Sequence, residues 1–79
     1  MDISEAFGRA VKARRAELGV KQDALADKAG MSRPHLSGIE RGAHEAGVRV
    51  VFNLAQALEC LPSDLWLTAE RLIESAREA

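Results

Sequence analysis

The chain has 79 residues, of which 47% are apolar, 4% aromatic and 29% charged, so it can form one small domain with a mainly aliphatic core. Cys60 is the only cysteine, which excludes an intrachain disulfide framework, and no apolar run approaches the roughly 18 to 20 residues that span a bilayer, so we expect a cytoplasmic protein. The net charge of −1 argues against nucleic acid, but residues 1–49 hold 9 Lys and Arg against 7 Asp and Glu (+2), and residues 50–79 hold 2 against 5 (−3), so a DNA-binding face would lie in the first part.

The first predicted helix begins after Asp2 and ends at Gly19. Asp2 and Glu5 are three residues apart, which is the spacing of a capping box at a helix start. The predicted inner face has apolar residues at helical spacing, namely Ile3, Phe7, Val11 and Leu18, with the small Ala10 beside them.

The second predicted helix is short and runs from about residue 22 to residue 29. It directs Leu25 and Ala26 inward, and the small Ala26 allows the next helix to approach closely. Gly30 ends it, and glycine readily adopts the positive φ that a tight turn after a helix requires.

The third predicted helix starts after Ser32, which is a good N-cap, and ends at Arg41 and Gly42. Leu36 and Ile39 are three residues apart and therefore anchor the same side of this helix to the core. Two short helices joined by a tight turn and anchored in this way meet the requirements of a helix-turn-helix over residues 22–41.

A fourth helix is predicted from about Val48 to Glu59, and a fifth begins at Pro62 and Ser63. The fourth helix is expected to direct inward Val48, Val51, Leu54, Ala55 and Leu58. The apolar members of the fifth are Leu65, Trp66, Leu72 and Ile73. We therefore expect an all-α fold, a compact five-helix bundle that forms a single domain over residues 1–79.

The third helix has an outer face unlike that of a core helix. At about 100° per residue, the side opposite Leu36 and Ile39 holds Arg33, Pro34, Ser37, Gly38 and Arg41. Arginine can contact guanine O6 and N7 bidentately, serine can donate to a base or a phosphate, and a proline ring can touch a thymine methyl group. Taken as isolated charges, these cations would better fit an ordinary solvated surface, but their position on one face of a helix-turn-helix favours a helix that enters a DNA major groove.

Three stretches of the chain resemble the Cro/cI-type (XRE family) helix-turn-helix of phage repressors and small bacterial regulators. They are VKARRAELGVKQDALADKAG, MSRPHLSGIERG and LAQALECLPSDLW. The resemblance covers roughly residues 7 to 67 and implies a lambda-repressor-like DNA-binding domain. By its length, its S-x-I-E-R-G run and its last helix, the chain looks most like the controller proteins of restriction–modification systems.

The resemblance implies base-facing positions at Arg33, Pro34 and Gly38, to which the outer-face pattern adds Ser37. It also implies a phosphate contact at Arg41, a phosphate-contacting and supporting role for Gln22, and a largely buried ion pair between Arg15 and Glu40 that holds the recognition helix in place. The complete set expected to contact phosphate is Lys21, Gln22, His35, Arg41 and His44.

Three positions depart from the family pattern. Lys21 stands where a serine, threonine or asparagine cap is usual, so the second helix loses a cap and gains a cation. Arg33 precedes Pro34, and a residue before proline resists the α conformation, so we expect a distorted first turn in the third helix. Gly47 follows Ala46 where Pro-Ser is frequent, which leaves the fourth helix weakly capped.

The sequence predicts no metal site and no active site. The spacing of His35, His44 and Cys60 does not fit zinc, and a fourth ligand is missing. Ser37 beside Glu40 lacks the base and orienting group of a hydrolase, and Cys60 is expected to be a small buried thiol. We therefore expect no enzyme, no cofactor and no small-molecule ligand.

The last part of the chain holds more large apolar residues than one small core readily absorbs. We expect residues 60–79 to form a dimerisation segment, because soluble homo-oligomers are most often two-fold dimers and the family commonly builds its interface from this helix. The interface residues would be Leu61, Leu65, Trp66 and Leu67. The alternative is that Trp66 and its neighbours simply close the bottom of the bundle.

Together these features predict a homodimeric, sequence-specific regulator of transcription that binds a short palindrome in double-stranded DNA and controls its own gene. Two other classes stay open. An antitoxin would also bind a partner protein, with the acidic end ERLIESAREA as its docking segment. A pure interaction module would use the fold without DNA, and the net charge of −1 favours that class.

Overall fold

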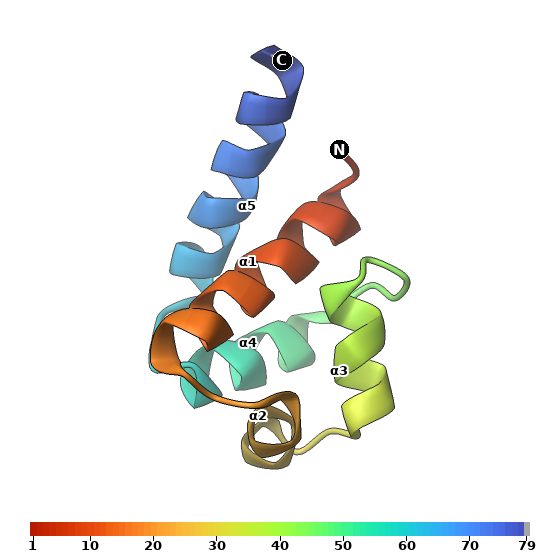
Figure 1. The fold of residues 1–79 in the computed structure, drawn as a ribbon, viewed down its shortest axis with the longest axis vertical. Coiled ribbons are helices and arrows are strands. Elements are labelled where there is room, and N and C mark those ends of the chain that lie inside the picture. The colour runs from red at the N-terminus through yellow and green to blue at the C-terminus, as the bar shows by residue number, and fades with distance from the viewer. Residues whose placement is uncertain (79) are drawn as a thin grey trace.

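A computed structural model describes residues 1–78, and within them the chain forms five α-helices and no strand (Figure 1). The helices are α1 Ile3–Leu18, α2 Gln22–Ala29, α3 Arg33–Glu40, α4 Val48–Ala57 and α5 Pro62–Glu78. The prediction of an all-α, five-helix fold is confirmed. The C-terminal end of α5 extends past the start of α1 (Figure 1). In the described part of the chain, no helix is long and apolar enough to cross a membrane.

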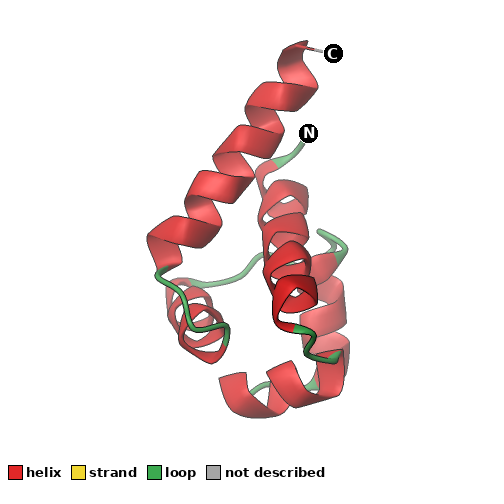
Figure 2. Cartoon of the chain, turned by 60° about the vertical axis from the view of Figure 1, so that its left-hand side comes forward, coloured by secondary structure: helices red, strands yellow, loops and turns green. Residues whose placement is uncertain are grey.

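The main core lies between α1, α2, α3 and α4, and Leu65 of α5 joins it. Both views show α1 between α5 on one side and α3 on the other, while α2 contacts α3 and α4 (Figures 1 and 2). The largest fully buried side chains are aliphatic, namely Val11, Leu25, Leu36, Ile39, Leu54 and Leu58. Burial of each such side chain contributes about 1.5 to 3 kcal/mol, so the two that α3 supplies, Leu36 and Ile39, contribute about 3 to 6 kcal/mol to its packing on the domain.

A second, smaller apolar cluster joins α1 to α5. Its buried members are the alanines Ala6, Ala10 and Ala69, with Leu72 and Ile73 packed against them. The small side chains allow the two helices to lie close together.

At the start of α5, the backbone N–H of Leu61 donates to Asp64 Oδ2 at 2.8 Å, which satisfies a donor at the helix N-terminus.

Two predicted inward-facing residues lie instead at helix starts outside the core. Ile3 is exposed, and Val48 is 90% exposed. The first buried residues of α1 and α4 are Ala6 and Val51, so each helix begins about one turn before it reaches the core. The predicted capping box is also wrong, because the Asp2 side chain makes no cap hydrogen bond.

The end of α4 and the side chain of Leu65 also differ from prediction. The helix ends at Ala57 rather than Glu59, because Glu59 has a left-handed backbone with φ of 56° and the N–H of Cys60 donates back to the carbonyl oxygen of Ala55 at 3.0 Å. Arg14 of α1 donates to the carbonyl oxygens of Leu58 (3.0 Å) and Glu59 (3.2 Å) just after the helix. Leu65 is only 2% exposed and packs in the core, so its placement at a dimer interface is wrong.

Gly8 allows α1 to approach the last turn of α3 closely. A Cβ atom at this position would collide with the carbonyl oxygen of Ile39 and would lie 2.8 Å from that of Glu40. Both obstacles are backbone atoms, which cannot move aside as a flexible side chain does. The glycine therefore fixes the spacing between α1 and the helix that carries the candidate site.

We expect Gly8→Ala to lower the free energy of unfolding by about 1 to 3 kcal/mol, because overpacking against backbone outweighs the higher helix propensity of alanine. Urea denaturation measures this change. Gly47→Ser is the matched control, since a Cβ at Gly47 meets nothing within 4 Å and serine can cap α4. Equal losses in both variants would show that α1 and α3 do not need this close approach.

Candidate nucleic-acid interface

The segment α2–turn–α3 is built as the sequence predicts. Gly30 ends α2 in the left-handed conformation with φ of 70°, and Ser32 leads into α3 with extended backbone. The hydroxyl oxygen of Ser32 accepts a hydrogen bond from the backbone N–H of His35 at 3.2 Å, which caps α3. Leu36 and Ile39 are buried and attach α3 to the core.

The start of α3 is regular despite the Arg33–Pro34 pair. The helix begins at Arg33, and the N–H of Leu36 donates to the carbonyl oxygen of Ser32 at 3.1 Å. Proline in the first turn removes no intrahelical hydrogen bond, so the predicted distortion is wrong. The expected lack of side-chain caps at Lys21 and Gly47 is confirmed.

A buried carboxylate ties α3 to α1 and α2. Glu40 Oε2 accepts from Arg15 Nε at 2.8 Å, and Glu40 Oε1 accepts from Arg15 Nη2 at 3.0 Å and from Gln22 Nε2 at 2.9 Å. The side chain of Glu40 is 3% exposed and that of Arg15 is 17% exposed. Arg15 Nη1 also donates to the carbonyl oxygen of Val20 at 3.0 Å. These bonds fix α3 from behind.

The ion pair is permanently charged on its arginine side. The hydrogen bond to Glu40 raises the pKa of the Arg15 guanidinium above its ordinary value, while burial opposes this increase. Arg15 therefore stays protonated wherever the protein is folded, and titration of this group does not weaken the network.

The opposite side of α3 is turned to solvent. Arg33, Pro34, His35 and Arg41 are exposed, and Ser37 is half-buried. Ser37 Oγ accepts a long hydrogen bond of 3.5 Å from Arg41 Nε. We use the name α3 face for Pro34 and the exposed or half-buried polar residues of this side and its borders, which are Lys21, Arg33, His35, Ser37, Arg41 and His44. It presents three cationic side chains and several hydrogen-bond donors.

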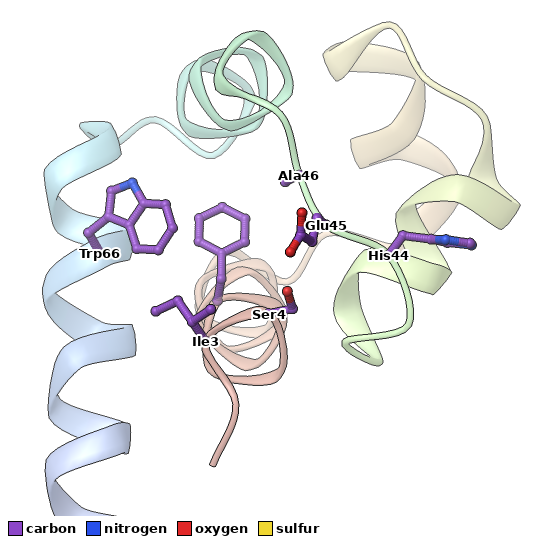
Figure 3. Close-up of a pocket in the computed structure, with 7 residues that line it drawn as sticks. Ile3, Ser4, His44, Glu45, Ala46 and Trp66 are labelled. Atoms are coloured by element: carbon purple, nitrogen blue, oxygen red, sulfur yellow. The ribbon is translucent and has the colours of Figure 1, made fainter.

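Gly38 does not belong to the α3 face. It is buried, and a Cβ atom there would collide with the imidazole carbon Cδ2 of His44. Figure 3 shows His44 pointing from the loop after α3 across that helix, away from Trp66. The His44 ring lies 6.0 Å from that of His35 in an edge-to-face arrangement. The predicted outward exposure of Gly38 is therefore wrong, because a loop side chain covers it.

Arg33 has an acidic neighbour that the sequence did not indicate. Its Nε lies 2.9 Å from Oδ1 of Asp23, in the first turn of α2. Both residues line an open recess of about 320 Å³, together with Arg15, Lys21 and Gln22. The two residues are ten positions apart in sequence, so neither helical spacing nor a motif indicates the contact. Only the opposite charges at the starts of α2 and α3 provide a signal.

A separate hollow of about 190 Å³ lies between the start of α1, the loop after α3, and α5 (Figure 3). The ring centroids of Phe7 and Trp66 are 4.9 Å apart on its apolar side.

The described residues offer neither a reactive thiol nor a metal site. Burial raises the pKa of the half-buried Cys60 thiol above its ordinary value, which disfavours the reactive thiolate. Among residues 1–78, no group of three or more His, Cys, Asp and Glu is placed to hold a metal ion.

Comparisons with known proteins relate the chain to regulators. The model of the helix-turn-helix family HTH_3 matches residues 11–65. The restriction-modification controller protein C.AhdI from Aeromonas hydrophila is 31% identical over 78% of this chain and 94% of its own, with a TM-score of 0.77.

The clp gene regulator ClgR from Corynebacterium glutamicum is 29% identical over 99% of this chain and 85% of its own, with a TM-score of 0.91. The DNA-binding domain of the P22 c2 repressor is 33% identical over 76% of this chain and 79% of its own, with a TM-score of 0.74. No curated protein gives a significant sequence match.

Proposed function

Because the chain belongs to the XRE type of the helix-turn-helix family HTH_3, a family of DNA-binding regulators, we propose that it is a homodimer that recognises a short palindromic operator through the α3 face. The observation that carries this proposal is the pose of α3. The helix is fixed from behind by Glu40 and is polar and exposed in front. That arrangement suits a recognition helix in the major groove.

We assign base contacts to Arg33, Pro34 and Ser37, all at or near the exposed start of α3. The guanidinium of Arg33 can donate to guanine O6 and N7, and the Ser37 hydroxyl can donate to a base edge. The ring of Pro34 supplies an apolar contact for a thymine methyl group. Gly38 takes no part, since His44 covers it.

Phosphate contacts are assigned around these residues to Lys21, Gln22, His35, Arg41 and His44. The side-chain amide of Gln22 already donates to Glu40, so its own contact with phosphate is expected from its backbone N–H at the start of α2. Lys21 and Arg41 act as point charges on either side of the bases, and such contacts fix the protein on the duplex without specifying sequence.

The proposed dimer interface uses exposed apolar side chains of α4 and the start of α5. Leu61, Trp66 and Leu67 keep the role predicted for residues 60–79 in this single domain. The structure adds Val48 and Phe52, which line an open groove of about 240 Å³ beside Pro62 and Trp66. An exposed apolar patch of this kind marks an interaction surface, and a second copy would cover it.

We expect Val48→Glu to raise the dissociation constant of the dimer at least about tenfold, because dimerisation would then bury an unpaired charge. The fold should be unaffected, since Val48 is 90% exposed. Sedimentation equilibrium measures the change, and Ala24→Glu adds the same charge at an exposed position of α2 as a control. Unchanged dimerisation in Val48→Glu would place the interface elsewhere.

Autoregulation is the mode of control that we propose. The chain is similar to C.AhdI, which is named as a restriction-modification controller protein. Its own concentration would then set the amount of bound dimer. In this role we expect it to act in the cytoplasm without catalytic activity, cofactor or small-molecule ligand.

The proposal is tested by selecting duplexes from a randomised pool with the purified protein. A symmetric dimer should enrich a two-fold symmetric sequence whose half-sites are about one helical turn, roughly 34 Å, apart. Enrichment of an asymmetric site would contradict the homodimeric arrangement. Failure to enrich any sequence would contradict sequence-specific recognition by the α3 face.

A second candidate function is that of an antitoxin. The distal part of α5 extends beyond the bundle (Figure 1), and Glu70, Glu74 and Glu78 follow each other at four-residue spacing on its exposed surface. This acidic stripe could dock onto a basic partner protein. Stoichiometric co-purification of a second chain with the native protein, lost on truncation after Ile73, which keeps the α1–α5 cluster, would favour this function.

A further inference from the structure

The contact between Arg33 and Asp23 places a carboxylate at the edge of the proposed DNA-binding surface. Asp23 is exposed and lies in the first turn of α2, next to Lys21 and Gln22. Its Oδ1 is 2.9 Å from Arg33 Nε, and the two side chains are 76% and 65% exposed. An acidic group here would repel the phosphates that the neighbouring cations attract.

The stability of the fold does not explain why a carboxylate lies at this position. Ion pairs between two side chains as exposed as these contribute little to folding, because water and salt screen them. The pair nevertheless changes how Arg33 is presented. The carboxylate oxygen approaches the guanidinium at Nε, as an ion pair rather than a hydrogen bond, so the edge of the guanidinium that carries Nη1 and Nη2 remains for a ligand. Two parallel donors on one edge are what bidentate contact with guanine O6 and N7 requires.

We propose that Asp23 is a specificity-determining positioning residue for DNA recognition by Arg33. It holds the guanidinium by its Nε side and directs the Nη edge toward the base pairs. It also competes with phosphate for the same guanidinium, so that Arg33 gains less from nonspecific backbone contact. This inference rests on the proposed function, since it assumes that the α3 face meets DNA.

When the charge of Asp23 is removed, we expect the affinity for unrelated DNA to rise and the sequence specificity to fall. In Asp23→Asn the affinity for DNA of unrelated sequence should rise about two- to fivefold, because one repulsive charge is lost. The ratio of specific to nonspecific affinity should fall about three- to tenfold, because Arg33 loses its orientation and part of its base contact. A residue with a merely structural role would lower both affinities together.

The experiment measures binding by fluorescence anisotropy at fixed salt. The probes are the duplex enriched from the randomised pool and a duplex of the same composition in shuffled order. The variants are Asp23→Asn, Arg33→Ala and the double variant, with Asp27→Asn as the matched control. Asp27 is also an exposed acid of α2, but it lies one turn further along the helix. Thermal unfolding verifies that each variant is folded.

Asp23→Asn should lower the specific-to-nonspecific ratio, and it should lower it no further when Arg33 is already alanine. Asp27→Asn should leave the ratio unchanged. Equal ratios in Asp23→Asn and Asp27→Asn would overturn the inference, as would an undiminished effect of Asp23→Asn in the Arg33→Ala background. If wild-type protein does not distinguish the two duplexes, the proposed function itself fails, which is a different result.

Discussion

Replacing Glu40 with alanine is expected to lower the free energy of unfolding by about 3 to 5 kcal/mol, because it removes one partner of a buried ion pair. The carboxylate accepts three hydrogen bonds from Arg15 and Gln22 and is 3% exposed. Its removal leaves the Arg15 guanidinium charged and largely covered, without its main partner. The loss should reduce Tm by about 12 °C or more in a domain of this size.

Calorimetry or circular dichroism at neutral pH measures this change. Glu45→Ala, which removes an exposed acid from the loop after α3, is expected to shift Tm by no more than a few degrees. The paired replacement Arg15→Met/Glu40→Leu should recover much of the lost stability, because it removes both charges and fills the space with apolar side chains. A Glu40→Ala protein with wild-type Tm would show that α3 is held by Leu36 and Ile39 alone.

Replacing Arg33 with alanine is expected to remove most of the discrimination between the selected duplex and shuffled DNA. A good bidentate arginine–guanine contact contributes about 1 to 3 kcal/mol, and a dimer makes two of them, so the specific affinity should fall at least about thirtyfold. Affinity for shuffled DNA should change much less, since only one charge per chain is lost.

Arg71→Ala is the control for that experiment, because it removes the same charge from an exposed position of α5, away from the α3 face. It should leave the ratio of the two affinities unchanged. Equal weakening on both duplexes in Arg33→Ala would identify Arg33 as a phosphate contact rather than a base contact. Base recognition would then have to come from other residues of the α3 face.

Local sequence signals were sufficient to predict the turn, the N-cap and the buried residues that position α3. Gly30 and Ser32 mark the turn and the cap because their chemistry acts within a few residues, and the structure shows both in these roles. Leu36 and Ile39 are buried as predicted, since helical periodicity places both on the same side of α3. The Arg15–Glu40 contact lies where the family resemblance implied it, although nothing in the spacing of these residues indicates it.

The errors have a common physical cause, which is that periodicity describes one helix and not what lies against it. Val48 has the right spacing for burial but lies one turn before α4 reaches the core. Leu65 was predicted to lie at the dimer interface, but it is buried in the core, and its neighbours Trp66 and Leu67 are exposed instead. Gly38 is covered by His44 because the following loop folds back across α3, and a helical projection contains no loop.

Recognition of DNA through the α3 face is tested most directly by titrating the selected duplex and its shuffled counterpart with wild-type protein over a series of salt concentrations. We predict two chains bound per selected duplex, tighter binding to the selected than to the shuffled sequence, and affinities for both that fall as salt rises, because phosphate contacts release counterions. Equal affinity for both duplexes, or no binding even at low salt, would contradict the proposed function.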